Sequence, residues 1–263
     1  ITTLDASGTG AVNVNGGMVN NLTVADNSTA TVSSGTVNTL SNASTTTVTG
    51  GTVSNMENIG TVNINGGTVT NLTNDSTANV NGGTVGTLTN TAGHAATVSS
   101  GTVNTLANAG TATVTGGTVD ALNNTGDTIV NDGTVGSLTN SGTTTIHGGT
   151  VTGSAAGSTG AINVAGGTYT NGTGTAALVN VASGTVNAAA GTITTLHVGG
   201  SGTANVNGAT VNTFTNAGTA TISGGSVDAL TNTGTANITG GTVTGSSEAS
   251  TGTINVAGGS YTG

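Results

Sequence analysis

The sequence repeats about every sixteen residues, and this period limits the possible folds more than any other feature. The segment TATVTGGTVDALNNTG (111–126) recurs with small changes as DTIVNDGTVGSLTNSG (127–142) and as TATISGGSVDALTNTG (219–234). Some repeats are two residues longer. A short fixed period is typical of repeat architectures, in which each unit packs only against its neighbours.

Four positions of the repeat each keep one kind of residue. In the segment 111–126 they are Val114, Val119, Leu122 and Asn124. A side-chain amide has donors and an acceptor, so Asn residues stacked at one corner can bond along the stack. We therefore predict a structural Asn ladder, which consists of Asn42, Asn58, Asn74, Asn90, Asn108, Asn124, Asn140, Asn216 and Asn232.

The pattern within one repeat is that of short strands. In TATV, alternation places Ala112 and Val114 on one face, while Val119 and Leu122 would fill two further sides of the core. At about 3.3 Å per residue, sixteen residues suffice for one circuit of a narrow coil. We predict an all-β protein, a single parallel β-solenoid (β-helix) of about fifteen short coils. The pattern leaves the hand of the coil open, with right-handed coiling preferred.

The solenoid is expected to run continuously over residues 1–263. Residues 173–202 depart from the repeat, since Gly-Thr-Val186 and Gly-Thr-Ile193 lie only seven residues apart, and an irregular coil is expected there. The segment 152–172 recurs 92 residues later as 244–263. We expect the chain to be a slice of a longer repetitive protein.

The composition excludes several classes of function. The 263 residues include no Lys or Arg, nine acids and no Cys. Without basic residues, nucleic-acid binding is not expected, because phosphate contacts depend on them. No apolar run is long enough for a membrane helix, so this segment is not expected to insert into a membrane.

The ionisable residues form no pattern that indicates catalysis. His94, His147 and His197 share no metal-ligand spacing, and only Asp127 and Asp132 are acids close in sequence. We expect no enzyme activity and no catalytic, metal or cofactor site. Tyr169 and Tyr261 replace Val in the two copies of the long repeat. Their interpretation is a wider local core, and the alternative is a platform on which a sugar stacks.

A repeated Thr-x-Thr pattern marks the side of the coil that should face outward. Its hydroxyl and methyl groups form the candidate surface-contact face: Thr29, Thr31, Thr45, Thr47, Thr111, Thr113, Thr143, Thr145, Thr219 and Thr221. In other repeats the pattern becomes Thr-x-Asn, as at Thr61 and Asn63.

At these columns the chain resembles the repetitive β-helical passenger regions of bacterial self-associating autotransporters and related large surface adhesins. The resemblance is one of repeat style and implies an extracellular, cell-surface location. It also implies a non-enzymatic structural or adhesive role, as a fibre, surface layer or cell–cell adhesin. The expected partner is the chain itself, in a homo-oligomer or filament, with surface glycans as a further candidate. The alternative is an ice-binding, antifreeze β-solenoid that uses the outward Thr-x-Thr face.

Overall fold

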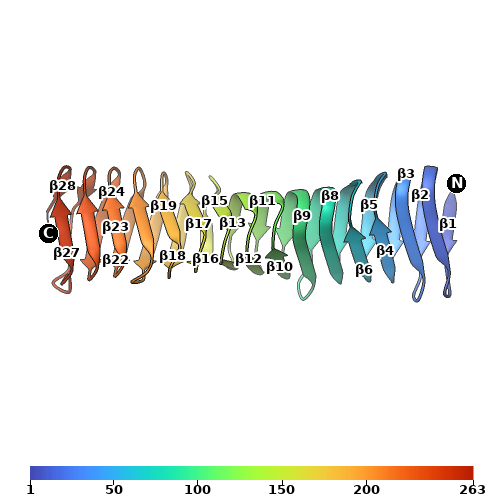
Figure 1. Cartoon of the computed structure of the whole chain (residues 1–263), viewed down its shortest axis with the longest axis horizontal. Helices are drawn as coiled ribbons and strands as arrows, with labels where there is room; N and C mark the ends of the chain where they lie inside the picture. The colour runs from blue at the N-terminus through green and yellow to red at the C-terminus, as the bar shows by residue number, and fades with distance from the viewer. Residues whose placement is uncertain (263) are drawn as a thin grey trace. The chain divides into compact units, whose positions relative to one another are not determined.

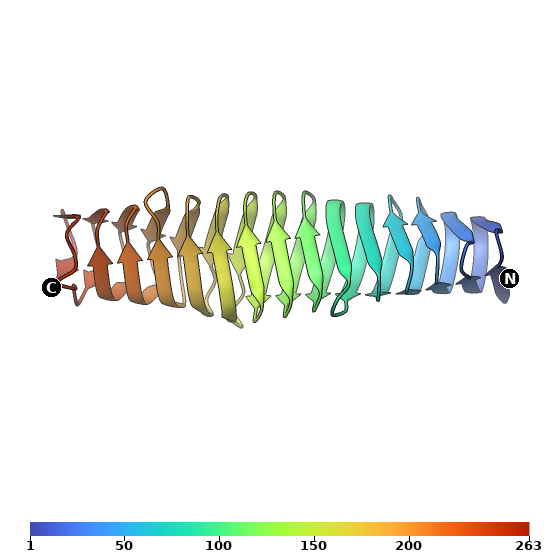
Figure 2. The same cartoon turned by 90° about the horizontal axis from the view of Figure 1, so that it is seen from below.

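The computed structural model describes residues 1–262, which contain strands, turns and no helix. The prediction of an all-β parallel β-solenoid is confirmed, with about 16 turns and repeats of about 16 residues. The chain divides into two compact units, residues 1–128 and 129–263. In both units the successive coils are seen as parallel rungs (Figure 1, Figure 2).

Unit 1 consists of parallel strands that pair with the equivalent strand of the next coil. They are β1 (Thr3–Ala6), β2 (Ala11–Val24), β3 (Thr29–Asn42), β4 (Thr45–Val48), β5 (Thr52–Asn58), β6 (Thr61–Ile64), β7 (Thr68–Asn74), β8 (Thr77–Asn90), β9 (Ala95–Asn108), β10 (Thr111–Val114) and β11 (Thr118–Asn124). The unit boundary lies within β12 (Asp127–Val130).

One coil of unit 1 shows how the repeat builds the core. In β10, Ala112 and Val114 are buried, as the alternation predicts, and Thr111 and Thr113, which alternate with them, point outward. In β11, Val119 and Leu122 are both buried although three residues apart. The two side chains belong to one strand with two outward residues between them, so they do not form separate strands. Each coil thereby contributes a nearly unbroken set of apolar side chains to a shared core.

Glycine is required at the corner between the two strands of a coil. Gly117 has a φ of +67°, and a Cβ atom there would lie 2.7 Å from the carbonyl oxygen of Gly101 in the preceding coil. Only glycine meets both conditions without strain.

Unit 2 continues the same kind of strand. Its strands are β13 (Thr134–Asn140), β14 (Thr143–Ile146), β15 (Thr150–Gly153), β16 (Ser158–Val164), β17 (Thr168–Asn171), β18 (Thr175–Val181), β19 (Thr185–Ala188), β20 (Thr192–Val198), β21 (Thr203–Val206), β22 (Thr210–Asn216), β23 (Thr219–Ile222), β24 (Ser226–Asn232), β25 (Thr235–Ile238), β26 (Thr242–Val243), β27 (Thr253–Val256) and β28 (Ser260–Tyr261).

Residues 173–202 contain β18, β19 and β20, and all three strands pair in parallel with their neighbours. The departure from the repeat changes which strands stack. Val164 pairs with Val181, which pairs with Val198, which in turn pairs with Asn216. Val206, which the repeat aligns with Val164, pairs instead with Ala188.

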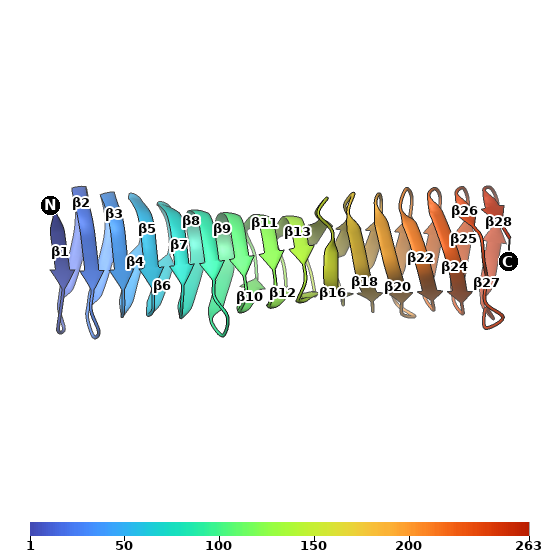
Figure 3. The ribbon, with the colours of Figure 1, turned by 180° about the vertical axis from the view of Figure 1, so that it is seen from behind.

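Unit 2 therefore contains a shift of half a coil between its earlier and later repeats. The shift separates two strand series, each of which runs along its own side of the coil. Series A contains β14, β16, β18, β20, β22, β24, β26 and β28, and series B contains β13, β15, β17, β19, β21, β23, β25 and β27. Figure 3 shows β16, β18, β20, β22 and β24 following one another.

Candidate functional site

The predicted Asn residues of unit 1 are buried and joined side chain to side chain. In each step, Nδ2 of one Asn donates to Oδ1 of the Asn in the next coil. The five steps run from Asn42 to Asn124, with donor–acceptor distances of 2.6, 2.7, 2.7, 2.8 and 2.8 Å. All six side chains are at most 1% exposed.

Each ladder amide also closes the turn that follows it. Asn58 Nδ2 donates to the carbonyl oxygen of Gly60 at 3.0 Å and to that of Thr77, in the next coil, at 2.9 Å. Backbone carbonyl groups at this corner are buried with the side chain and need donors. The Asn column is thus a structural element that joins one coil to the next.

In unit 2 the half-coil shift separates the predicted ladder residues. Asn140 lies in β13, outside series A, whereas Asn216 and Asn232 lie in series A. Asn216 Nδ2 donates to Asn232 Oδ1 at 2.7 Å. The residue that pairs with Asn216 in the preceding coil is Val198, whose side chain has no hydrogen-bond donor. Asn216 Oδ1 is accordingly buried without a hydrogen-bond partner.

One further buried Asn of unit 2 was not predicted. Asn171 is 3% exposed, and its Nδ2 donates to the carbonyl oxygen of Ala190 at 2.8 Å. Its Oδ1 accepts from the hydroxyl group of Tyr169 at 3.1 Å. The signal in the sequence is the Gly that follows Asn171, since a Gly closes many of the ladder turns as well.

The outward residues of the TATV-type strands form a neutral face on unit 1. Thr29 pairs with Thr45, and Thr31 pairs with Thr47. In two later coils, Ala95 pairs with Thr111, and Thr97 pairs with Thr113. Two further coils between them have Thr-x-Asn, and Asn79 Nδ2 donates to Asn63 Oδ1 at 3.0 Å. The seven segments of this neutral face contain no acid and no His: 11–14, 29–32, 45–48, 61–64, 77–80, 95–98 and 111–114.

The acids of residues 1–126 lie elsewhere on the coil. Asp5, Glu57 and Asp120 belong to β1, β5 and β11, which form the other side, and Asp26 and Asp75 lie in turns. Over residues 1–126 the coil therefore has one neutral side and one side that bears carboxylates, and the exposed Asp127 of β12, which pairs with β10, ends the neutral side.

The single face expected from the sequence does not form within unit 2. Thr143 and Thr145 lie in β14 of series A, whereas Thr219 and Thr221 lie in β23 of series B. The two pairs are separated because the half-coil shift moves the TATV pattern from one side of the coil to the other.

Series B carries a longer row than the one predicted. Its first column has Thr in eight successive coils, in register through backbone pairing: Thr134, Thr150, Thr168, Thr185, Thr203, Thr219, Thr235 and Thr253. The second column continues with Thr152, Thr170, Asn187, Asn205, Thr221, Asn237 and Asn255. Together these two columns are the Thr row of unit 2. The members in β13, β15, β17 and β19 were missed, because their Gly-Thr-Val and Gly-Thr-Tyr positions were assigned to another side of the coil.

No family model, curated protein or solved structure matches this chain. The interpretation of its surfaces therefore depends on the geometry and the chemistry of the residues themselves.

The described residues give no grouping typical of a reactive centre. No three of their His, Asp and Glu side chains come together as metal ligands. Within residues 1–262 there is also no helix of the length and apolarity that would cross a membrane.

Tyr169 belongs to the core, which confirms the first interpretation of this residue. It is 1% exposed, and burial raises the pKa of its phenol well above the ordinary range. Because the ring is covered, it cannot serve as a platform for sugar stacking.

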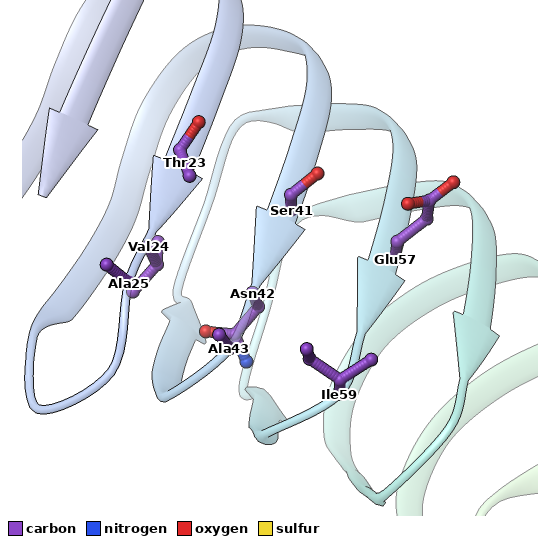
Figure 4. Close-up of a pocket in the computed structure, with 8 residues that line it drawn as sticks. All are labelled: Thr23, Val24, Ala25, Ser41, Asn42, Ala43, Glu57 and Ile59. Carbon is purple, nitrogen blue, oxygen red and sulfur yellow. The ribbon is translucent and has the colours of Figure 1, made fainter.

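A shallow hollow of about 130 Å³ lies on unit 1 (Figure 4). Thr23, Ser41 and Glu57 come from neighbouring strands on one edge of it, and Ile59 lies beside Ala43 on the other. Ile59 is 62% exposed, which is unusual for so large an apolar side chain in this chain.

Proposed function

We propose that this chain is a non-enzymatic structural element of the cell surface that associates with other copies of itself. The observation that supports the proposal is the division of residues 1–126 into a neutral Thr/Asn side and a side with carboxylates. Hydroxyl and amide groups can exchange hydrogen bonds across a contact without the cost of desolvating ions. The resemblance to self-associating autotransporter passengers supports an extracellular location.

The neutral face is flat enough and regular enough to meet a second copy of itself. Strands 4.8 Å apart and about 13 Å wide give seven coils an area of roughly 400 Å² on each partner. A standard stable interface takes about 800 Å² from each partner. Contact through unit 1 is therefore weak for one pair of faces and becomes stronger as more coils take part.

The absence of bases makes this contact insensitive to salt. The chain has no Lys or Arg, so copies cannot attract one another through side-chain ion pairs with Lys or Arg. Screening by salt then removes little attraction and weakens the repulsion between the net charges of −9. Association should be unchanged or slightly stronger as the salt concentration rises.

The experiment compares two triple variants by light scattering and sedimentation. Thr45→Glu, Thr77→Glu and Thr111→Glu place a charge in alternate coils of the neutral face. Thr39→Glu, Asn71→Glu and Thr105→Glu place the same charge in alternate coils of the other side. Because no basic side chain is present, an added carboxylate meets only neutral or negative groups.

We expect the first triple variant to lose association and the second to keep it. Equal loss in the two variants would assign the effect to net charge and reject the neutral face as the contact. A parent protein that stays monomeric at high concentration would reject self-association itself.

A further inference from the structure

The Thr row of unit 2 is the longest uniform surface feature found in that unit. Eight coils in succession present Thr at the first column, and the backbone pairing fixes their order. Parallel strands set a spacing of about 4.8 Å between coils, and alternate residues of a strand lie about 6.6 Å apart. The two columns therefore form a regular net of hydroxyl, methyl and amide groups.

The side chains of this net have little freedom. Thr is branched at Cβ, which restricts its χ1 angle on a strand. The Asn members are held by one another, since Asn205 Nδ2 donates to Asn187 Oδ1 at 3.0 Å and Asn255 Nδ2 to Asn237 Oδ1 at 2.8 Å. The positions of the polar groups are thus fixed before any ligand arrives, which lowers the entropic cost of binding.

The row is also free of charge. Strands β15, β17, β19, β21, β23, β25 and β27 contain one ionisable residue, Tyr169, which is buried and neutral. An ionic solid or a charged polymer would find no counter-charge on this surface. A neutral ligand made of repeating hydrogen-bond donors and acceptors is its complement.

The shape of the row restricts the ligand further. Sites for small molecules are concave and mostly apolar, whereas this row is the outer face of a set of strands and is polar. The one aromatic ring in these strands is covered by the core. An extended, neutral row of regular spacing fits the surface of an extended solid better than it fits a soluble sugar.

We propose that the Thr row of unit 2 binds crystalline water. Ice is an uncharged lattice in which every molecule both donates and accepts hydrogen bonds. The row offers it hydroxyl and amide groups at fixed spacing, with Thr methyl groups between them. This function is independent of self-association, because it uses series B of unit 2 and not the neutral face of unit 1.

The test uses ice itself as the probe, with the full chain carrying Thr45→Glu, Thr77→Glu and Thr111→Glu so that association does not contribute. Thermal hysteresis and partition of the protein into a growing ice crystal are measured for this background. Thr168→Glu, Thr203→Glu and Thr235→Glu are then added to the row. The matched control adds Ala161→Glu, Thr195→Glu and Thr231→Glu to series A in the same three coils.

We expect the background and the control to be enriched in ice and to show hysteresis, and the row variant to lose at least nine tenths of both. Circular dichroism checks that all three proteins keep their strands. A background protein that is excluded from ice overturns the proposal, as does a control that loses as much as the row variant. Binding of the background to crystalline cellulose or chitin, with exclusion from ice, would overturn it in favour of a polysaccharide surface.

Discussion

The side-chain oxygen Oδ1 of Asn216, which has no hydrogen-bond donor, predicts that a hydroxyl group at position 220 will stabilise unit 2. At two other Asn residues, the side chain four residues later supplies a donor to Oδ1. Thr46 Oγ1 donates to Asn42 Oδ1 at 2.9 Å, and Thr144 Oγ1 donates to Asn140 Oδ1 at 3.1 Å. The residue four positions after Asn216 is Ala220, which has no donor.

Thr should fit at position 220 without crowding the core. Ala220 is fully buried, and its partners in the adjacent coils are Ala204 and Ala236. Thr46, which occupies the same position in its own coil, has Ala30 and the larger Val62 as partners. The space around position 220 is therefore at least as large as the space that holds Thr46.

The comparison of Ala220→Thr with Ala220→Val isolates the hydroxyl group, since the two side chains have the same shape. A buried hydrogen bond contributes about 0.5–1.5 kcal/mol, and an unmatched buried acceptor costs about 1–3 kcal/mol. We expect the Thr variant to exceed the Val variant by about 1–2 kcal/mol in the free energy of unfolding. Urea denaturation measures the difference, and hydrogen exchange at the amides of residues 232–235 locates it. If the two variants unfold at the same urea concentration, the missing donor has no energetic cost and the explanation fails.

Three further predictions test the core and the corners. Asn74→Ala should lower the free energy of unfolding, measured by urea denaturation, by about 1–3 kcal/mol, because it removes two buried ladder bonds. Asn71→Ala is the control: the Asn71 side chain is exposed, so this variant should lower the free energy of unfolding by under about 0.5 kcal/mol. Gly117→Ala should lower the melting temperature more than Gly93→Ala, since both have a positive φ but only Gly117 would place a Cβ against the preceding coil. Burial raises the pKa of the Tyr169 phenol, so the folded protein holds this group neutral. The contribution of the neutral phenol to stability is therefore complete below the ordinary Tyr pKa of about 10 and is lost as the pH rises above that value. Between about pH 9 and pH 12, the melting temperature of Tyr169→Phe should fall less than that of the parent protein.

The alternation of apolar and polar residues was sufficient to predict the strands and much of the core. Ala112 and Val114 are buried as the period of two requires, and the Asn column forms bonded steps over unit 1. Both results depend on local rules, since one repeat contains the whole pattern. Within β11, two outward residues separate Val119 from Leu122, and both of these side chains are buried in the same core.

The half-coil shift of unit 2 could not be predicted from the repeat. Both strands of a coil present Val to one shared core, so Val164 can pair with Val181 as readily as with a residue of its own column. Which strand stacks on which depends on the lengths of the turns in residues 173–202. The predicted surface face was divided for the same reason, and the Thr row was found only once the pairing of the strands was known.

The most direct test of the proposed association is a spin label placed on each side of unit 1 in turn. The chain contains no Cys, so Thr77→Cys on the neutral face and Thr73→Cys on the other side each give one labelled position. As the protein concentration rises, we expect the spectrum of the label at position 77 to broaden and report restricted motion, while the label at position 73 stays mobile. Scattering that shows association while the label at position 77 remains as mobile as the label at position 73 would contradict this expectation.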